Sequence, residues 1–181
     1  MTGNLFLEKS RYYLATEYPS KIRLAVADLS YDDIWRRPNE DSNSIGNLIV
    51  HLAGNIRQWI VAGIGGAPGD RDRASEFEMR NGPGLPELLK LLASAVDDAD
   101  QVLAALSKKD LRLARTIQGR ETNVLDAIYH VVEHFSMHTG QIIMMAKMYA
   151  PGSVKFYDNA GGNAVPLWGG REGMPATPKG I

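Results

Sequence analysis

The sequence predicts an all-α protein that folds as an up-and-down four-helix bundle. Apolar residues recur every three or four positions over four long segments, and few stretches show the alternation that is typical of strands. The chain has 181 residues, of which 44% are hydrophobic and 23% charged, as in ordinary globular domains. One domain of this length can bury a large core. We therefore expect four helices around a shared apolar interior.

The first predicted helix covers residues 4–29. Its apolar side chains recur at helical spacing, but Pro19 lies inside it and should kink or split it. Proline has this effect because it lacks an N–H and its ring clashes with the preceding turn. A short helical turn should follow at residues 31–35.

The second predicted helix should begin at Asn43 or Ser44, because both residue types are good N-caps. It should end at the glycines that begin with Gly63. Residues 65–86 alternate glycine and proline with charges of both signs, which predicts a long polar loop between the second and third helices. Loops of this length are often functional.

The third predicted helix covers residues 86–106, and the fourth runs from Thr122 or Asn123 to about Tyr149. Between them, residues 112–122 contain a β-branched pair and a glycine, which indicates a short extended segment or a turn.

The end of the chain has a different composition from the predicted bundle. Residues 1–155 should form the bundle, and residues 156–181 an irregular C-terminal extension rich in glycine and proline. Phe156 and Trp168 could pack the first half of this extension on the body of the protein. From Gly169 onward we expect a mobile tail.

Charge and composition argue against several kinds of partner and site. The 20 Lys and Arg against 21 Asp and Glu give no electrostatic reason to expect binding to nucleic acid or to a membrane surface. The chain contains no cysteine, so any metal must be held by His, Asp, Glu or the backbone. The N-terminal segment carries charges where a signal peptide would be apolar, and no run of about 18 apolar residues occurs. We expect a soluble, cytoplasmic protein.

Histidines carry the main functional signal. All four lie on the second and fourth predicted helices, and three of them, His130, His134 and His138, form one stripe on the fourth. His134 and His138 lie nearer the apolar direction than His130, and their i,i+4 spacing lets two imidazoles converge on one cation. His51 borders the apolar face of the second helix in the same way. If these helices pack together, three imidazoles meet and leave positions for water or substrate, as in a catalytic metal site.

Simpler interpretations of these residues stay open. Histidines at the border of an apolar face are often hydrogen-bonded or solvated, and an H-x-x-x-H pair recurs by chance. We interpret Glu133 as a solvated charge and the methionines of the fourth helix as core filler. Asn47, Asn55, His130 and Gln141 lie near the histidine stripes and could orient ligands or substrate.

Two segments resemble the DinB-like superfamily of four-helix-bundle metalloenzymes, namely residues 44–55 (SIGNLIVHLAGN) and residues 133–142 (EHFSMHTGQI). The loop at residues 70–77 fits too, and the resemblance, to a branch of unknown function, covers residues 6–155. It implies an up-and-down bundle with a long loop between its second and third helices, and dimers are common in the superfamily. It also implies a divalent metal, generally zinc or nickel, bound in this chain by His51, His134 and His138.

The resemblance also implies a class of chemistry. Some members of the superfamily are S-transferases or isomerases that use a low-molecular-weight thiol such as bacillithiol, mycothiol or glutathione. Because this chain has no cysteine, a thiolate activated by the metal would have to come from such a cosubstrate.

The leading hypothesis is a metal-dependent enzyme, either a thiol transferase or a hydrolase, in which the cation lowers the pKa of a bound water or thiol. It would act on a small-molecule substrate, as a cytoplasmic homodimer. The competing hypothesis is a non-catalytic helical stress-response protein that binds a metal or a small molecule. Water or a small ligand at an open coordination position would favour the enzyme.

Overall fold

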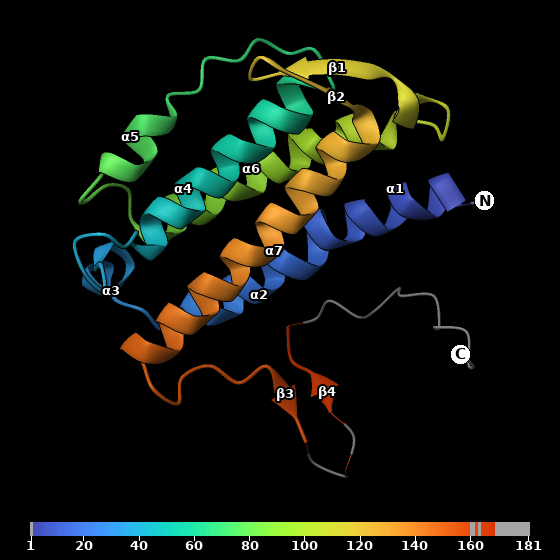
Figure 1. Ribbon diagram of the computed structural model, residues 1–181. Helices are drawn as coiled ribbons and strands as arrows, with labels where there is room; N and C mark the ends of the chain where they lie inside the picture. The colour runs from blue at the N-terminus through green and yellow to red at the C-terminus, as the bar shows by residue number, and fades with distance from the viewer. Residues whose placement is uncertain (1, 160–161, 163, 169–181) are drawn as a thin grey trace.

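The computed structural model describes residues 2–159, 162 and 164–168. In this part the chain is mostly helical, and it also contains two short antiparallel sheets of two strands each (Figure 1). The predicted all-α class is therefore correct for the dominant structure and misses the two sheets. None of the described helices is long and apolar enough to cross a bilayer.

The first helical run departs from α geometry just before Pro19. Helix α1 (Thr2–Tyr12) is followed by the π-helical segment η1 (Tyr13–Glu17) and then by α2 (Tyr18–Val26). Pro19 lies in the first turn of α2. It cannot donate a backbone hydrogen bond to the turn before it, and a wider π turn accommodates this loss. The predicted interruption is present, but on the N-terminal side of the proline.

The next two helices begin with capping boxes, α3 (Tyr31–Trp35) at Ser30 and α4 (Ile45–Ile56) at Ser44. The Ser44 hydroxyl accepts from the Asn47 N–H, and the Asn47 side-chain oxygen accepts from the Ser44 N–H. Helix α4 passes directly into a π-helical segment, η2 (Arg57–Ala62), and Gly63, the first of the predicted glycines, is its C-cap.

The long connection contains a helix that the sequence analysis did not predict. Helix α5 (Arg73–Glu78) begins at Asp72, whose carboxylate accepts hydrogen bonds from the backbone N–H groups of Ala74 and Ser75. The prediction of a continuous loop over residues 65–86 is therefore wrong. Asp72 is a good N-cap, but the glycines and prolines on either side of this short helix are typical of a loop, so the helix was not predicted.

The second half of the chain follows the predicted pattern. Helices α6 (Leu85–Ala104) and α7 (Val124–Tyr149) are connected through a 3-10 turn, η3 (Asp110–Arg112). The predicted extended segment is a hairpin in which β1 (Ala114–Ile117) pairs with β2 (Arg120–Asn123).

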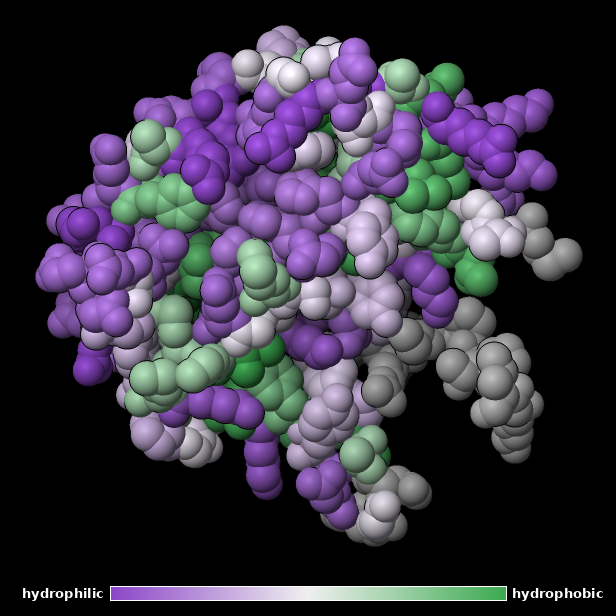
Figure 2. Space-filling model, viewed as in Figure 1, coloured by the Kyte–Doolittle hydropathy of each residue, from purple (hydrophilic) through white to green (hydrophobic). Residues whose placement is uncertain are grey.

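Helix α4 packs against both α6 and α7, and α2 packs against α7 (Figure 1). Their facing side chains form one core in which Ile49, Leu92 and Phe135 are fully buried. Each such side chain contributes roughly 1.5–3 kcal/mol through burial. The face of the molecule seen in Figure 2 is largely hydrophilic, with its hydrophobic residues in separate patches. The contact between α4 and α7 brings the two histidine-bearing helices together.

The described residues after α7 return to the helical body. Strand β3 (Tyr157–Asp158) pairs with β4 (Val165–Pro166), and the buried Trp168 donates from Nε1 to a Glu17 carboxylate oxygen at 3.0 Å. The first half of the predicted extension thus packs on the body. The tail predicted from Gly169 onward lies outside the described residues.

Glu17 anchors this C-terminal segment and makes its attachment sensitive to pH. Burial alone would raise the pKa of Glu17, but hydrogen bonds from Lys21, Trp168 and Tyr12 outweigh burial and lower it. We predict that the carboxylate stabilises the fold fully above the pKa of an unfolded Glu, about 4.3. The stabilisation is lost as the pH falls through the lower pKa of the folded state.

Chemical denaturation of the wild type and Glu17→Gln at pH 7 and pH 3 measures this effect. The wild type should be more stable by about 1–3 kcal/mol at pH 7 and by much less at pH 3. An equal difference at the two pH values would contradict the assignment.

Candidate metal centre

Three histidine side chains converge between α4 and α7. The Nε2 atom of His134 lies 3.0 Å from Nε2 of His51 and 3.1 Å from Nε2 of His138. One ring nitrogen of each residue lies within 4.8 Å of those of the other two. His51 and His138 are buried, and His134 is partly buried. The three histidines singled out in the sequence therefore form a group that could hold a metal ion.

The second ring nitrogen of two of these histidines is fixed by a neighbour. Nδ1 of His51 lies 2.8 Å from Oε2 of Glu76. A carboxylate only accepts, so this contact favours the tautomer with the ring proton on Nδ1 and a lone pair on Nε2. Nδ1 of His138 lies 2.6 Å from Oε1 of Gln141, an amide oxygen that also accepts. Two lone pairs therefore point into the histidine group.

The central histidine cannot satisfy both neighbours. Nε2 of His134 can carry one proton and can donate it to only one of the two lone pairs at a time. Its Nδ1 is buried and has no hydrogen-bond partner in the described part of the chain. Three Nε2 atoms thus meet with at most one proton among them, whereas a divalent cation accepts a lone pair from each. The residues fit such an ion.

Burial favours the neutral form of two of these imidazoles, those of His134 and His138. The pKa of His134 is lowered to about 3, chiefly by burial and in addition by the neighbouring His138 and His51. Burial also lowers the pKa of His138, although the hydrogen bond to Gln141 opposes this. Neutral imidazole is the form that binds metal, so at neutral pH these rings need not lose a proton first.

Glu76 lies on the unpredicted helix α5 and is held by Arg71. Arg71 donates from Nε to Oε1 of Glu76 at 2.6 Å and from Nη2 to Oε2 at 2.7 Å. Burial alone would raise the pKa of Glu76, but the hydrogen bonds from Arg71 and His51 outweigh it and lower the pKa. The carboxylate is therefore ionised at neutral pH. The ring of Phe77, 4.6 Å from that of His51 between centroids, covers the same histidine.

Neither Arg71 nor Glu76 was predicted to belong to the site, because both lie in the segment that was expected to be a polar loop. No helical periodicity links them to His51, which lies 20 and 25 positions earlier in the chain. The N-cap at Asp72 was a usable signal for a helix, although not for its contact with a histidine.

Of the other candidate residues, Gln141 contacts the histidine group directly, through Nδ1 of His138. Asn47 completes the capping box of α4 and donates to the Glu76 backbone oxygen at 2.8 Å, so it holds α5 against α4. His130 lies outside the group and packs on Trp59, with 4.3 Å between ring centroids. Asn55 is buried, and its Oδ1 has no hydrogen-bond partner within the described residues.

Two interpretations of the fourth predicted helix can be checked directly. Glu133 is exposed, as a solvated charge should be. The methionines are mostly not core filler, because Met137, Met144 and Met148 are exposed and only Met145 of the four is buried. These three methionines lie on the side of α7 that faces away from the core.

Gly54 leaves the space that the Glu76–Arg71 pair occupies. A Cβ at this position would lie 2.1 Å from Oε1 of Glu76 and 2.8 Å from Nε of Arg71. We predict that Gly54→Ala displaces Glu76 from His51 and lowers the free energy of unfolding by about 1–3 kcal/mol.

The matched control is Gly140→Ala on the exposed side of α7, where a Cβ would meet nothing within 4 Å. Because alanine favours helix over glycine by about 1 kcal/mol, this variant should be neutral or more stable. Chemical denaturation compares the two. If Gly54→Ala is as stable as Gly140→Ala, the carboxylate is not confined as the structure indicates.

Comparison with known proteins gives one family match. The profile of a family described as "Protein of unknown function (DUF1572)" matches residues 2–157. This range contains the three histidines and the residues that hydrogen-bond to them. No curated protein matches the sequence.

Proposed function

The chain belongs to the DUF1572 family, whose function is unknown, and we propose from its site that it is a divalent-metal-dependent enzyme. His51, His134 and His138 would hold the ion through their Nε2 atoms. The observation that carries this proposal is the meeting of three Nε2 atoms, with that of His134 3.0 Å from His51 and 3.1 Å from His138. A divalent ion on three neutral ligands lowers the pKa of a bound water or thiol and so supplies a nucleophile near neutral pH.

The surrounding residues orient the histidines for this role. Glu76 and Gln141 accept the Nδ1 protons of His51 and His138, which keeps both Nε2 lone pairs directed into the group. Three protein ligands also leave a position for water or substrate, as catalytic zinc sites do.

We propose zinc or nickel as the metal, because imidazole ligands suit both ions. As the reaction we propose transfer of a low-molecular-weight thiol to a small electrophilic substrate. The DinB-like resemblance supports this class, and the chain has no cysteine of its own to serve as the thiol. The up-and-down bundle that the resemblance implies is supported by four long helical runs, with His51 on the second and His134 and His138 on the last.

We predict that protein purified without a histidine tag binds about one zinc or nickel ion per chain. His134→Ala should abolish tight binding, because His134 lies between the other two ligands. His130→Ala should bind as the wild type does, because its ring packs on Trp59 outside the group.

Isothermal titration calorimetry and metal analysis after dialysis measure these differences. Equal losses in the two variants would show that the ligand set is wrong. Wild-type protein that stays metal-free after reconstitution with both ions would overturn the proposed function.

Thiol transfer is tested with bacillithiol, mycothiol, glutathione and coenzyme A as donors and an electrophilic bimane as acceptor. We predict that the metal-loaded protein exceeds both the metal-free protein and His138→Ala by more than about tenfold, because His138 is one of three ligands. Equal rates from all three proteins with every thiol would remove the transferase assignment and leave a metal-binding protein without this activity.

A further inference from the structure

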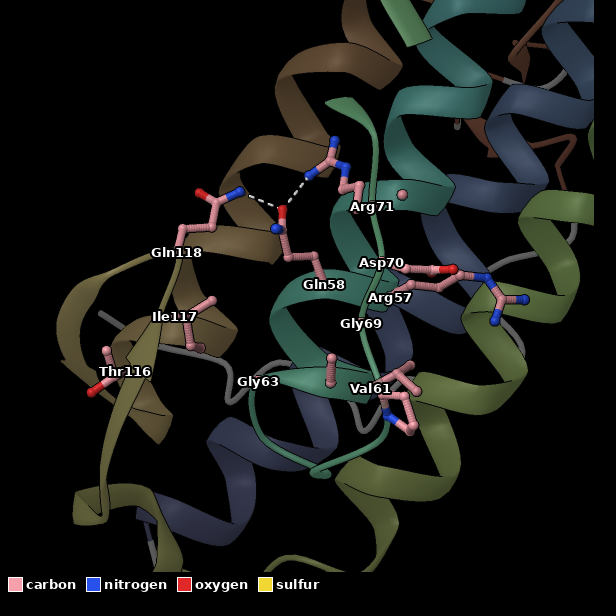
Figure 3. Close-up of a pocket in the computed structure, with 13 residues that line it drawn as sticks. Arg57, Gln58, Val61, Gly63, Gly69, Asp70, Arg71, Thr116, Ile117 and Gln118 are labelled. Carbon is pink, nitrogen blue, oxygen red and sulfur yellow. Dashed lines mark hydrogen bonds between the residues drawn. The ribbon is translucent and has the colours of Figure 1, made fainter. Parts of the chain in front are cut away.

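A chain of hydrogen bonds leads from the tip of the β1–β2 hairpin to His51. Gln118 donates from Nε2 to Oε1 of Gln58, and Arg71 donates from Nη1 to the same oxygen at 2.7 Å (Figure 3). Arg71 also holds Glu76, which accepts from Nδ1 of His51. We propose that Gln58 and Gln118 are positioning residues of the histidine centre, which act by holding Arg71. The inference rests on the proposed metal site.

Gln58 is placed to receive both donors. It lies in η2 (Arg57–Ala62), about two turns beyond His51 along the same helical run. With Arg71 and Gln118 it lines a cleft of about 590 Å³, and Figure 3 shows both of those side chains pointing to the Gln58 oxygen. In the described part of the chain, Gln58 is the acceptor for Nη1 of Arg71. It therefore fixes the end of the guanidinium that Glu76 does not hold.

Anchoring matters because Arg71 has a second possible partner on His51. Nη2 of Arg71 lies 3.0 Å from Nδ1 of His51, close to the 2.8 Å between that nitrogen and Glu76. If Nη2 donated to Nδ1 in place of the Glu76 oxygen, the ring proton would sit on Nε2. That tautomer has no lone pair on Nε2, the atom that faces the other two histidines. Holding Arg71 against Glu76 and Gln58 therefore favours the metal-binding tautomer.

Gln118 is an unfavourable residue for its turn. Its φ is 53° and that of Gly119 is 72°, and among the described residues it is the one non-glycine with positive φ. Two-residue hairpin turns with this geometry favour Asn-Gly, because asparagine tolerates the left-handed conformation better. The longer glutamine instead carries its amide to Gln58. A residue that the turn disfavours and that contacts a second element points to a role beyond the turn.

The variant Gln118→Asn separates a positioning role from a structural one. Asparagine suits the turn better, but its side chain is one methylene shorter and does not reach Gln58. We expect an unchanged or higher Tm together with roughly tenfold weaker zinc binding, the usual cost of losing a partner behind a metal ligand.

Gln58→Leu should weaken zinc binding to a similar extent, because it removes the acceptor. Gln58→Glu keeps the acceptor oxygen and should bind zinc nearly as the wild type does. Gln101→Leu on an exposed position of α6 is the matched control and should change neither property.

Imidazole ¹⁵N NMR of the metal-free protein reads the tautomer of His51 without depending on a metal. The wild type and Gln58→Glu should carry the proton on Nδ1, whereas Gln58→Leu and Gln118→Asn should show a measurable Nε2–H fraction. Unchanged zinc affinity or an unchanged tautomer in both weakened variants overturns the inference and leaves the proposed function standing. If the wild type binds no zinc, the proposed function fails, and the tautomer alone decides the positioning role.

Discussion

A carboxylate buried as deeply as that of Glu76, which is 5% exposed, has to be paired on both oxygens, because an unpaired buried charge costs several kcal/mol. Arg71 pairs with both oxygens, and the ring proton of His51 completes the arrangement. The pair lies flat against α4 only because Gly54 has no side chain there. One buried ion pair therefore fixes the position of α5, requires a glycine in α4 and sets the tautomer of a histidine.

The start of α4 is tied to the same constraint. Asn47 accepts from the Ser44 N–H in the capping box, and its amide nitrogen donates to the backbone oxygens of Glu76 and Met79. A residue of the capping box thus also docks the segment that carries Glu76. A local capping signal and a long-range contact share one side chain, so helix initiation and assembly of the site depend on each other.

The features that could be predicted from the sequence are those set by interactions between residues close together in the chain. The starts of α4 and α7 were each predicted to within two residues, at Asn43 or Ser44 and at Thr122 or Asn123, because caps act over three or four positions. The second residue of each pair is the cap. Helical periodicity also placed His134 and His138 on one face, so packing α4 against α7 was enough to bring His51 to them.

The remainder depended on contacts that no local pattern encodes. Arg71 and Glu76 reach His51 only because the connection after η2 runs back along α4. The composition of this connection predicted only that it is polar, and it carried no information on its path. The reach of Gln118 to Gln58 joins residues 60 positions apart. The helical positions of the histidines in α7 correctly predicted which of them lie nearest the core. The methionines of α7 were interpreted from their residue type and not from their positions on the helix, and most of them are exposed.

The pairing of Glu76 also explains why a carboxylate so close to the histidines is not among their group. Both of its oxygens are engaged by Arg71, so its charge is matched by a guanidinium and it serves His51 as an acceptor. Were it free to join the histidines, it would cancel part of the charge of a bound cation and weaken its effect on the pKa of a bound water or thiol. Arg71 therefore has two effects: it orients His51 through Glu76, and it keeps that carboxylate out of the histidine group. Under the proposed function this separation would leave the charge of the cation unneutralised, whereas a purely structural metal site would gain affinity from a fourth protein ligand.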